Sequence, residues 1–496
     1  MGIVYKQSLK NTFFLLLGFT IGGINALFLY TRFLEDEYYG LVAFVLSSSA
    51  VLLPLIVFGM QSSVIKFYST YKTKKEQDGF LITSLLFPLL IIIPMAIVGI
   101  LFYEHISTWI STKNPLIKNY TFYIFLIAIF MGYFELFYAW SKVKMQSVFG
   151  NFIKEVFQRF CTTFLLIAVY YNWLSKEEFI YALTIVYAIR MLLMLIYALY
   201  LYTPKLIFKL PKNSNEIFKY SFYIILSASA GGILLEIDKF MLPQIKVGLE
   251  KVAFYSVAVH IATVVGIPAR AMLQIATPIT AKELNNNNLS EVKKLYKGSS
   301  ISLLIAGGLL FLLVNLNIID LYKIIGNPNY ATGIYVVLMI SLAKLFELLL
   351  GTNSAILVNS DYYKIYFYFS VAMALSVIYL NDYFINLFGG NGAALATLIV
   401  VVLYGIIKLI YVNHKLKMQP LTKNTALILG ITGLFYAVFQ LWSFEINPII
   451  NIILKTFVIS IIYIFIVYKL ELSKEINSII DKLIKGIKPQ DKPRTQ

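Results

Sequence analysis

Long apolar stretches recur along almost the whole chain and restrict its fold more than any other feature. A bilayer-spanning helix needs about 20 mostly apolar residues. Fourteen stretches of roughly this length can be counted, at 11–31, 40–62, 80–103, 120–138, 151–171, 179–202, 219–238, 252–276, 300–319, 331–352, 363–380, 393–412, 424–442 and 448–468. Only 14% of the 496 residues are charged, too few to cover the surface of about three soluble domains. We therefore predict an all-α polytopic membrane protein with about 14 transmembrane helices.

The lysines and arginines are distributed unevenly between the predicted loops. Alternate segments that include both chain ends hold 28 of them, the opposite loops hold 7, and the other 7 lie within spans. Cytoplasmic loops are enriched in Lys and Arg, so this bias predicts cytoplasmic N- and C-termini and cytoplasmic loops at 66–79 and 282–298. It also accounts for the net charge of +17 without a nucleic-acid partner.

Two parts of the chain share an ordered pattern at an offset of about 209 residues. The pattern is Lys-x-Thr/Ser-Phe at 10–13 and 219–222, Gly-Gly-Ile at 22–24 and 231–233, and a proline in the following span, Pro54 and Pro268. Six predicted helices separate the copies, so both halves have the same orientation. This is the parallel repeat of one class of transporters, which bind substrate between the halves. Close helix packing alone would also explain the glycines.

The repeat and the loops together predict five regions. These are an N-lobe of six helices (1–205), a cytoplasmic linker (206–218), a C-lobe of six helices (219–415), a final helix pair (420–469) and a cytoplasmic amphipathic tail (470–496). Apolar residues recur at helical spacing among lysines in the tail, which predicts a helix lying on the anionic cytoplasmic leaflet.

Several short motifs resemble those of a known family. They are Asp238-Lys239-Phe240-Met241-Leu242 after Gly231-Gly232-Ile233, Tyr255-Ser256-Val257-Ala258, the stretch from Ile267-Pro268 to Thr277-Pro278, Arg32-Phe33-Leu34 with Tyr39-Gly40, and Leu342-Ala343-Lys344 with Gly351-Thr352-Asn353. The pattern is similar to that of bacterial oligosaccharide flippases. These are the Wzx-like polysaccharide transporters of the multidrug/oligosaccharidyl-lipid/polysaccharide exporter superfamily. The resemblance covers essentially the whole chain.

The resemblance implies a flippase that moves undecaprenyl-pyrophosphate-linked oligosaccharide across the bacterial inner membrane by alternating access, for surface polysaccharide biosynthesis. The expected partners are the polyprenyl-pyrophosphate-linked glycan and membrane lipids, with Na⁺ or H⁺ as alternative coupling ions. We expect a monomer, no cofactor and no enzymatic activity.

Two other functions are kept as alternatives. The first is a cation-coupled multidrug exporter of the same superfamily, although the first two spans contain no Asp or Glu. The second is a membrane enzyme of glycan assembly. A polymerase of that kind usually needs a large external loop, which the chain lacks, and an acyltransferase needs a buried catalytic histidine, for which His260 is the one candidate.

Four cations within the spans are candidate ligands for a pyrophosphate: Arg270, Arg190, Arg159 and Lys344. A charge at mid-membrane costs about 2.5–3.5 kcal/mol, so each needs a partner or an aqueous cavity. The planar fork of arginine matches phosphate oxygens. The resemblance favours Arg270, because related lipid II flippases line their cavity with arginines, one of them in the eighth helix. The alternative for Arg270 and Arg190 is a structural bond to a backbone carbonyl or a carboxylate.

The other two cations have carboxylates nearby in the predicted spans. Lys154 and Arg159 lie at the same depth as Glu135 and Glu155, which favours a paired cluster over a cavity rim. Likewise, Lys344 and Glu347 are three residues apart on one helix face.

Two acidic residues near the outer end of the seventh span, Glu236 and Asp238, are candidates for ion coupling. Carboxylate oxygens are the ligands that hard cations prefer. The alternative, which we favour, is an interfacial ion pair with Lys239.

Overall fold

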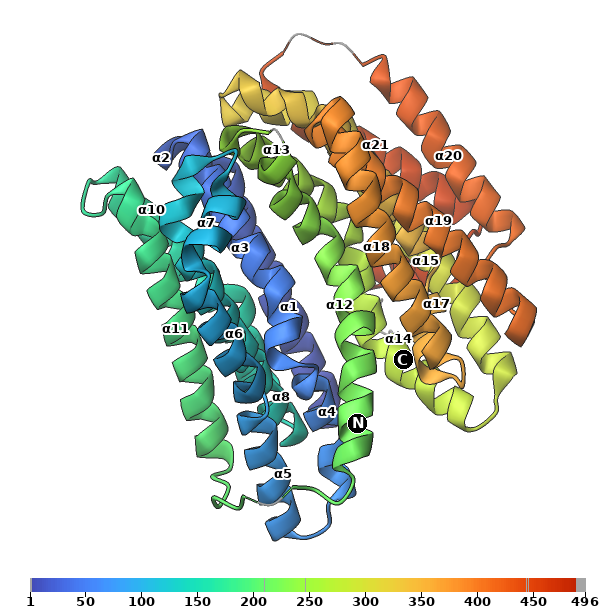
Figure 1. Cartoon of the computed structure of the whole chain (residues 1–496). Helices are drawn as coiled ribbons and strands as arrows, with labels where there is room; N and C mark the ends of the chain where they lie inside the picture. Colours follow the sequence, from blue (N-terminus) through green and yellow to red (C-terminus); the bar gives the residue numbers. More distant parts are fainter. Residues whose placement is uncertain (1, 209, 246, 443, 445, 488–496) are drawn as a thin grey trace, which may run out of the picture. The chain divides into compact units, whose positions relative to one another are not determined.

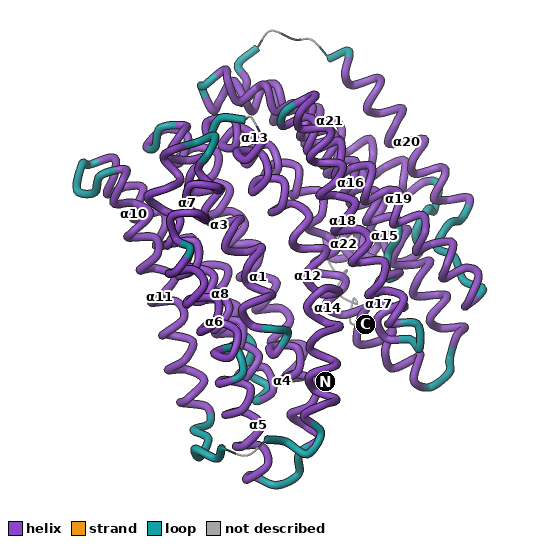
Figure 2. Tube along the Cα trace, viewed as in Figure 1, coloured by secondary structure: helices purple, strands orange, loops and turns teal. Residues whose placement is uncertain are grey.

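Helices joined by short loops make up the described part of the chain, and no strand occurs there (Figure 2). The computed structural model describes residues 2–208, 210–245, 247–442, 444 and 446–487, with side chains except at 2–6, 8–9, 226–233 and 483–487. Gly231-Gly232-Ile233 and the apolar residues of the tail beyond 482 therefore lie outside the described side chains.

The helices follow one another as Figure 1 labels them. The first eleven are α1 (Gly2–Ile24), α2 (Tyr30–Phe33), α3 (Asp36–Val57), α4 (Met60–Phe67), α5 (Lys74–Leu86), α6 (Leu89–Leu101), α7 (Tyr103–Ser111), α8 (Thr121–Val143), α9 (Val148–Phe152), α10 (Gln158–Tyr170) and α11 (Lys176–Leu201). The others are α12 (Ser214–Ile245), α13 (Leu249–Thr263), α14 (Ile267–Asn285), α15 (Leu289–Ile325), α16 (Ile334–Leu349), α17 (Asn353–Asn359), α18 (Tyr363–Phe388), α19 (Gly390–Leu416), α20 (Lys423–Gln440), α21 (Pro448–Lys469) and α22 (Lys474–Ile487).

Local sequence explains where several of these helices begin and end. The hydroxyls of Thr73, Ser175 and Thr422 each accept a hydrogen bond from the backbone N–H three residues on, which satisfies a free donor of the first turn. Helix α3 ends where Phe58 and Gly59 adopt positive φ angles of 49° and 68°. Glycine takes such angles without steric penalty, so α4 can leave in a new direction.

The fold confirms a multi-pass membrane protein. Among the described residues, 11 helical segments are long and apolar enough to cross a bilayer. The other three expected spans fall in α9 to α10, in α12 and in α20. The count of fourteen therefore stays a prediction.

The chain divides into two compact units that do not follow chain order. Unit 1 contains residues 1–260, 329–336 and 364–400, and unit 2 contains 261–328, 337–363 and 401–496. The division into two parallel lobes stays a prediction.

Each unit has its own hydrophobic core. In unit 1, α8 packs against both α3 and α11 (Figure 1), and its Phe134 and Trp140 are buried there. In unit 2, α15 packs against α20 and α21, with Leu312, Ile459 and Tyr463 at the centre of the core.

Gly40 marks a close approach between two helices of unit 1. A Cβ atom at this position would lie 1.7 Å from the backbone oxygen of Leu249, at the start of α13. Gly40→Ala should therefore lower the free energy of unfolding by at least about 2 kcal/mol, since the backbone must move. Gly99→Ala is the matched control, because no atom lies within 4 Å of the new Cβ. Thermal unfolding in detergent compares the two, and equal midpoints would contradict the close contact.

Candidate functional site

Arg190 is a buried cation in the middle of α11, only 6% exposed. Its guanidinium carbon lies 4.0 Å from the ring centre of Phe134 and 5.6 Å from that of Tyr187. Its Nε has no hydrogen-bond partner, and no ion pair to this residue occurs among the described residues. The side chain is therefore held by aromatic faces, which attract cations, and it lies close enough to Glu135 and Glu155 to interact with their charges without a salt bridge to either.

Two ion pairs in unit 1 involve the carboxylates of Glu135 and Glu155. Lys154 Nζ lies 2.6 Å from Glu135 Oε1, and Arg159 Nη1 lies 2.9 Å from Glu155 Oε2. This confirms the predicted paired cluster. Arg159 also packs against α1, where a Cβ at Gly18 would lie 2.7 Å from its Nη1. A small residue is therefore needed at this position for the two helices to meet.

The two predicted cations of unit 2 differ in their surroundings. Arg270, in the first turns of α14, is exposed, and no ion pair to it occurs in the described part of the chain. Lys344 on α16 is paired with Glu347 at 2.8 Å, as predicted. Lys408 on α19, which sequence reasoning did not single out, is close enough to Glu347 to interact with its charge. The carboxylate of Glu347 therefore interacts with both Lys344 and Lys408.

Asp238 is the centre of a buried polar cluster in unit 1. Its side chain is 0% exposed and accepts three hydrogen bonds from other helices. Asn381 Nδ2 donates to Oδ1 at 2.8 Å, while Tyr255 Oη and Thr397 Oγ1 donate to Oδ2 at 2.5 and 2.9 Å. The Oδ1 of Asn381 has no hydrogen-bond partner. The cluster therefore gathers a carboxylate, two hydroxyls and a free amide oxygen, which is the donor type that Na⁺-like hard cations use.

The neighbouring acid, Glu236, makes the predicted ion pair. Its Oε2 lies 2.7 Å from Lys239 Nζ, one helical turn away. The two acids proposed for ion coupling thus have different surroundings: Glu236 is neutralised by a cation, and Asp238 is held by neutral donors. His260 stacks its ring on that of Phe19 at 5.1 Å.

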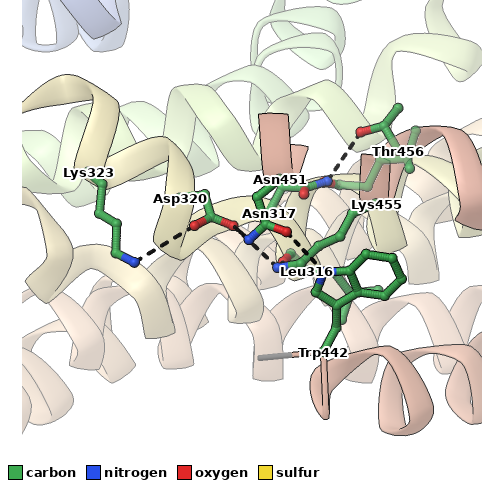
Figure 3. A network of polar contacts seen from close by, with 9 residues as sticks. Leu316, Asn317, Asp320, Lys323, Trp442, Asn451, Lys455 and Thr456 are labelled. Carbon is green, nitrogen blue, oxygen red and sulfur yellow. Dashed lines mark hydrogen bonds and ion pairs between the residues drawn. The ribbon is translucent and has the colours of Figure 1, made fainter. Parts of the chain in front are cut away.

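A second buried charge cluster lies in unit 2, between α15 and α21 (Figure 3). Asp320 Oδ2 accepts hydrogen bonds from Lys455 Nζ at 3.2 Å and from Asn451 Nδ2 at 2.8 Å. Trp442 donates its indole N–H to Asn451 Oδ1 at 2.9 Å. Sequence reasoning missed this cluster because 135 residues separate the two charged partners.

Comparison with known proteins gives a consistent picture. A family model described as "Polysaccharide biosynthesis protein" matches residues 8–282. Among solved structures, the chain is similar to the lipid II flippase MurJ in an inward closed conformation, with a TM-score of 0.71 and 18% identity over 94% of this chain and 99% of that one. No curated protein matches it.

Two other solved structures share the fold at lower similarity. An inward-facing multidrug resistance MATE family transporter of the MOP superfamily has a TM-score of 0.57 and 13% identity, over 81% of this chain and 94% of that one. A MOP superfamily transporter from Pyrococcus furiosus has a TM-score of 0.56 and 12% identity, over 83% and 96%. The family model covers more than half of the 496 residues, and the fold is that of MurJ and MATE transporters. The chain therefore belongs to the family of polysaccharide biosynthesis proteins.

Proposed function

We propose that this protein flips undecaprenyl-pyrophosphate-linked oligosaccharide from the inner to the outer leaflet of the bacterial inner membrane by alternating access. Family membership supports a role in polysaccharide biosynthesis. The observation that carries the proposal is Arg270, an exposed arginine of α14 that makes no ion pair among the described residues. A pyrophosphate would supply the missing negative charge, and the low dielectric of the membrane would strengthen the attraction.

The four predicted cations would contribute unequally. Arg270 is accessible, so its fork can bind a phosphate directly. Arg190 is buried against aromatic rings of unit 1, so it is a weaker candidate for direct contact with a phosphate. Arg159 and Lys344 are held in ion pairs with Glu155 and Glu347, so each would have to leave its partner to bind substrate.

A reconstituted transport assay tests the proposal. The purified protein is placed in liposomes with lipid-linked oligosaccharide in the inner leaflet, and arrival in the outer leaflet is measured by oxidation with membrane-impermeant periodate. We expect exposure of the glycan to be faster than in empty liposomes. Equal rates would contradict the proposal.

A cation-coupled multidrug exporter is the second candidate, and the likeness to MATE transporters supports it. The same liposomes, loaded with a fluorescent cationic dye, distinguish the two functions. Efflux of the dye under an imposed Na⁺ or H⁺ gradient, without movement of the glycan, would replace the flippase by the exporter.

Asp238 is the residue that we propose for ion coupling. Its carboxylate can take a proton or, together with Thr397, Tyr255 and the free oxygen of Asn381, provide oxygens for Na⁺. Glu236 stays a weaker candidate, because Lys239 already neutralises it.

Asp238→Asn should remove the dependence of transport on an ion gradient. The substitution keeps the size of the side chain and one acceptor oxygen, but it replaces the other oxygen by an NH2 donor and removes the charge that a cation needs. We expect the acceleration by an imposed Na⁺ or H⁺ gradient, about tenfold for a typical coupling energy, to disappear. Asp361→Asn, at an exposed aspartate between α17 and α18, is the control. A variant at Asp238 that still responds to both gradients would exclude this site.

A further inference from the structure

An apolar cavity of about 310 Å³ opens beside the linker between α11 and α12. Its walls come from α4, α5, the first residue after α5, the linker and the first turn of α12, all within unit 1. Apolar lining residues include Met60, Phe80, Phe87, Leu210, Ile217 and Phe218. The volume lies at the lower end of the range for small-molecule pockets, about 300–1,000 Å³. The cavity can therefore hold a portion of a single hydrocarbon chain.

Packed aromatic rings form one wall of the cavity. The ring of Phe58 lies 5.5 Å from that of Phe87 and 5.3 Å from that of Phe218. Phe58 is held at a positive φ by the break between α3 and α4, so the ring cluster is fixed by the backbone. Such a wall favours an apolar occupant.

The linker beside the cavity has apolar side chains that are exposed on the surface of the protein. Leu206, Phe208 and Leu210 are 75%, 77% and 71% exposed. They lie between α11 and α12, at the end of unit 1 that holds α5 (Figure 2). Three such side chains next to lysines are typical of a segment embedded at the lipid headgroup level.

Lysines lie near the cavity, together with Glu216 and with Glu76 of α5, which is close enough to Lys212 to interact with its charge. Lys212 and Lys219 directly follow the lining residues Pro211 and Phe218 in the chain, and both are exposed. Lys66 Nζ lies 3.9 Å from the ring centre of Tyr220, in the same turn of α12. Glu216 is the one acidic residue in that first turn. A lipid with an anionic headgroup near the lysines and an acyl chain in the apolar cavity fits this arrangement.

We propose that the cavity binds one acyl chain of an anionic glycerophospholipid, whose phosphate is held by Lys212 and Lys219. The lysine bias of the loops assigns this end to the cytoplasmic leaflet, which is rich in anionic lipids. The bound lipid ties the linker to the membrane beside α12. The proposal is independent of the transported substrate.

Native mass spectrometry of the delipidated full-length protein tests this, with phosphatidylglycerol and phosphatidylcholine of identical acyl chains as probes. We expect phosphatidylglycerol to be retained preferentially. Lys212→Gln with Lys219→Gln should weaken its binding at least tenfold, since each lysine contributes roughly a fivefold factor at a membrane surface. Lys293→Gln with Lys294→Gln, at two exposed lysines near the start of α15, is the matched control, and it should bind as the wild type does.

A second variant tests the cavity itself. Thr83 lines the cavity, so Thr83→Phe should fill it and reduce the retention of both lipids, whereas Thr112→Phe, at an exposed position after α7, should not. Equal retention of the two lipids by the wild type, or unchanged binding in the lysine or the Thr83 variant, would overturn the proposal. Displacement of phosphatidylglycerol by equimolar undecaprenyl phosphate would also overturn it and assign the cavity to the polyprenyl lipid.

Discussion

Arg270→Ala should slow glycan export at least about tenfold while leaving folding and membrane insertion intact. The side chain is exposed and makes no ion pair among the described residues, so its removal leaves no buried carboxylate behind. A hydrogen bond to a charged group contributes about 1.5–3 kcal/mol, so losing the bidentate contact with a pyrophosphate should slow flipping by at least about tenfold.

Arg270→Lys separates charge from geometry. Lysine keeps the positive charge but loses the planar fork, so we expect only partial rescue of transport. Arg32→Ala is the arginine control, because Arg32 lies in the last turn of α2 beside the ring of Phe28 and is no candidate ligand. The periodate assay in liposomes measures all three variants. Normal export by Arg270→Ala would show that the residue is structural.

The apolar spans and the local charge pairs could be predicted from the sequence alone. Span length depends on bilayer thickness, so composition over about 20 residues is enough to find most spans. Lys344 with Glu347 and Arg159 with Glu155 are three and four residues apart, the spacing at which helical side chains meet. Both pairs can therefore be predicted from the sequence.

Polar clusters that join distant helices could not be predicted in the same way. Asp238 was a candidate, but its donors Asn381 and Thr397 are neutral residues that lie 143 and 159 positions further along the chain. Neutral polar residues are common in transmembrane helices and carry no pattern that names their partner. In the sequence, Lys455 is a charged residue within the apolar stretch 448–468, and no pattern there names Asp320 as its partner.

The pairing of Lys455 with Asp320 leads to a prediction about stability. Their side chains are 9% and 7% exposed, whereas that of Lys323, the other cation near Asp320, is 63% exposed. Lys455 Nζ also donates to the backbone oxygen of Leu316 at 3.2 Å. Removing one partner would leave a single charge in an apolar core, which is much less favourable than either the pair or an apolar replacement.

Asp320→Ala should therefore lower the free energy of unfolding by about 3–5 kcal/mol, and Lys455→Ala by a similar amount. The double variant Asp320→Leu with Lys455→Met removes both charges and should be nearly as stable as the wild type. Lys323→Ala should cost no more than about 1 kcal/mol, because its ion pair is exposed and 3.9 Å long. Unfolding of the purified variants in detergent, followed by tryptophan fluorescence, gives the four values. The double variant could instead lose as much stability as the two single variants combined. The ion pair would then contribute stability beyond neutralising its own two charges. That result would contradict the expectation that an apolar replacement is as favourable as the pair between α15 and α21.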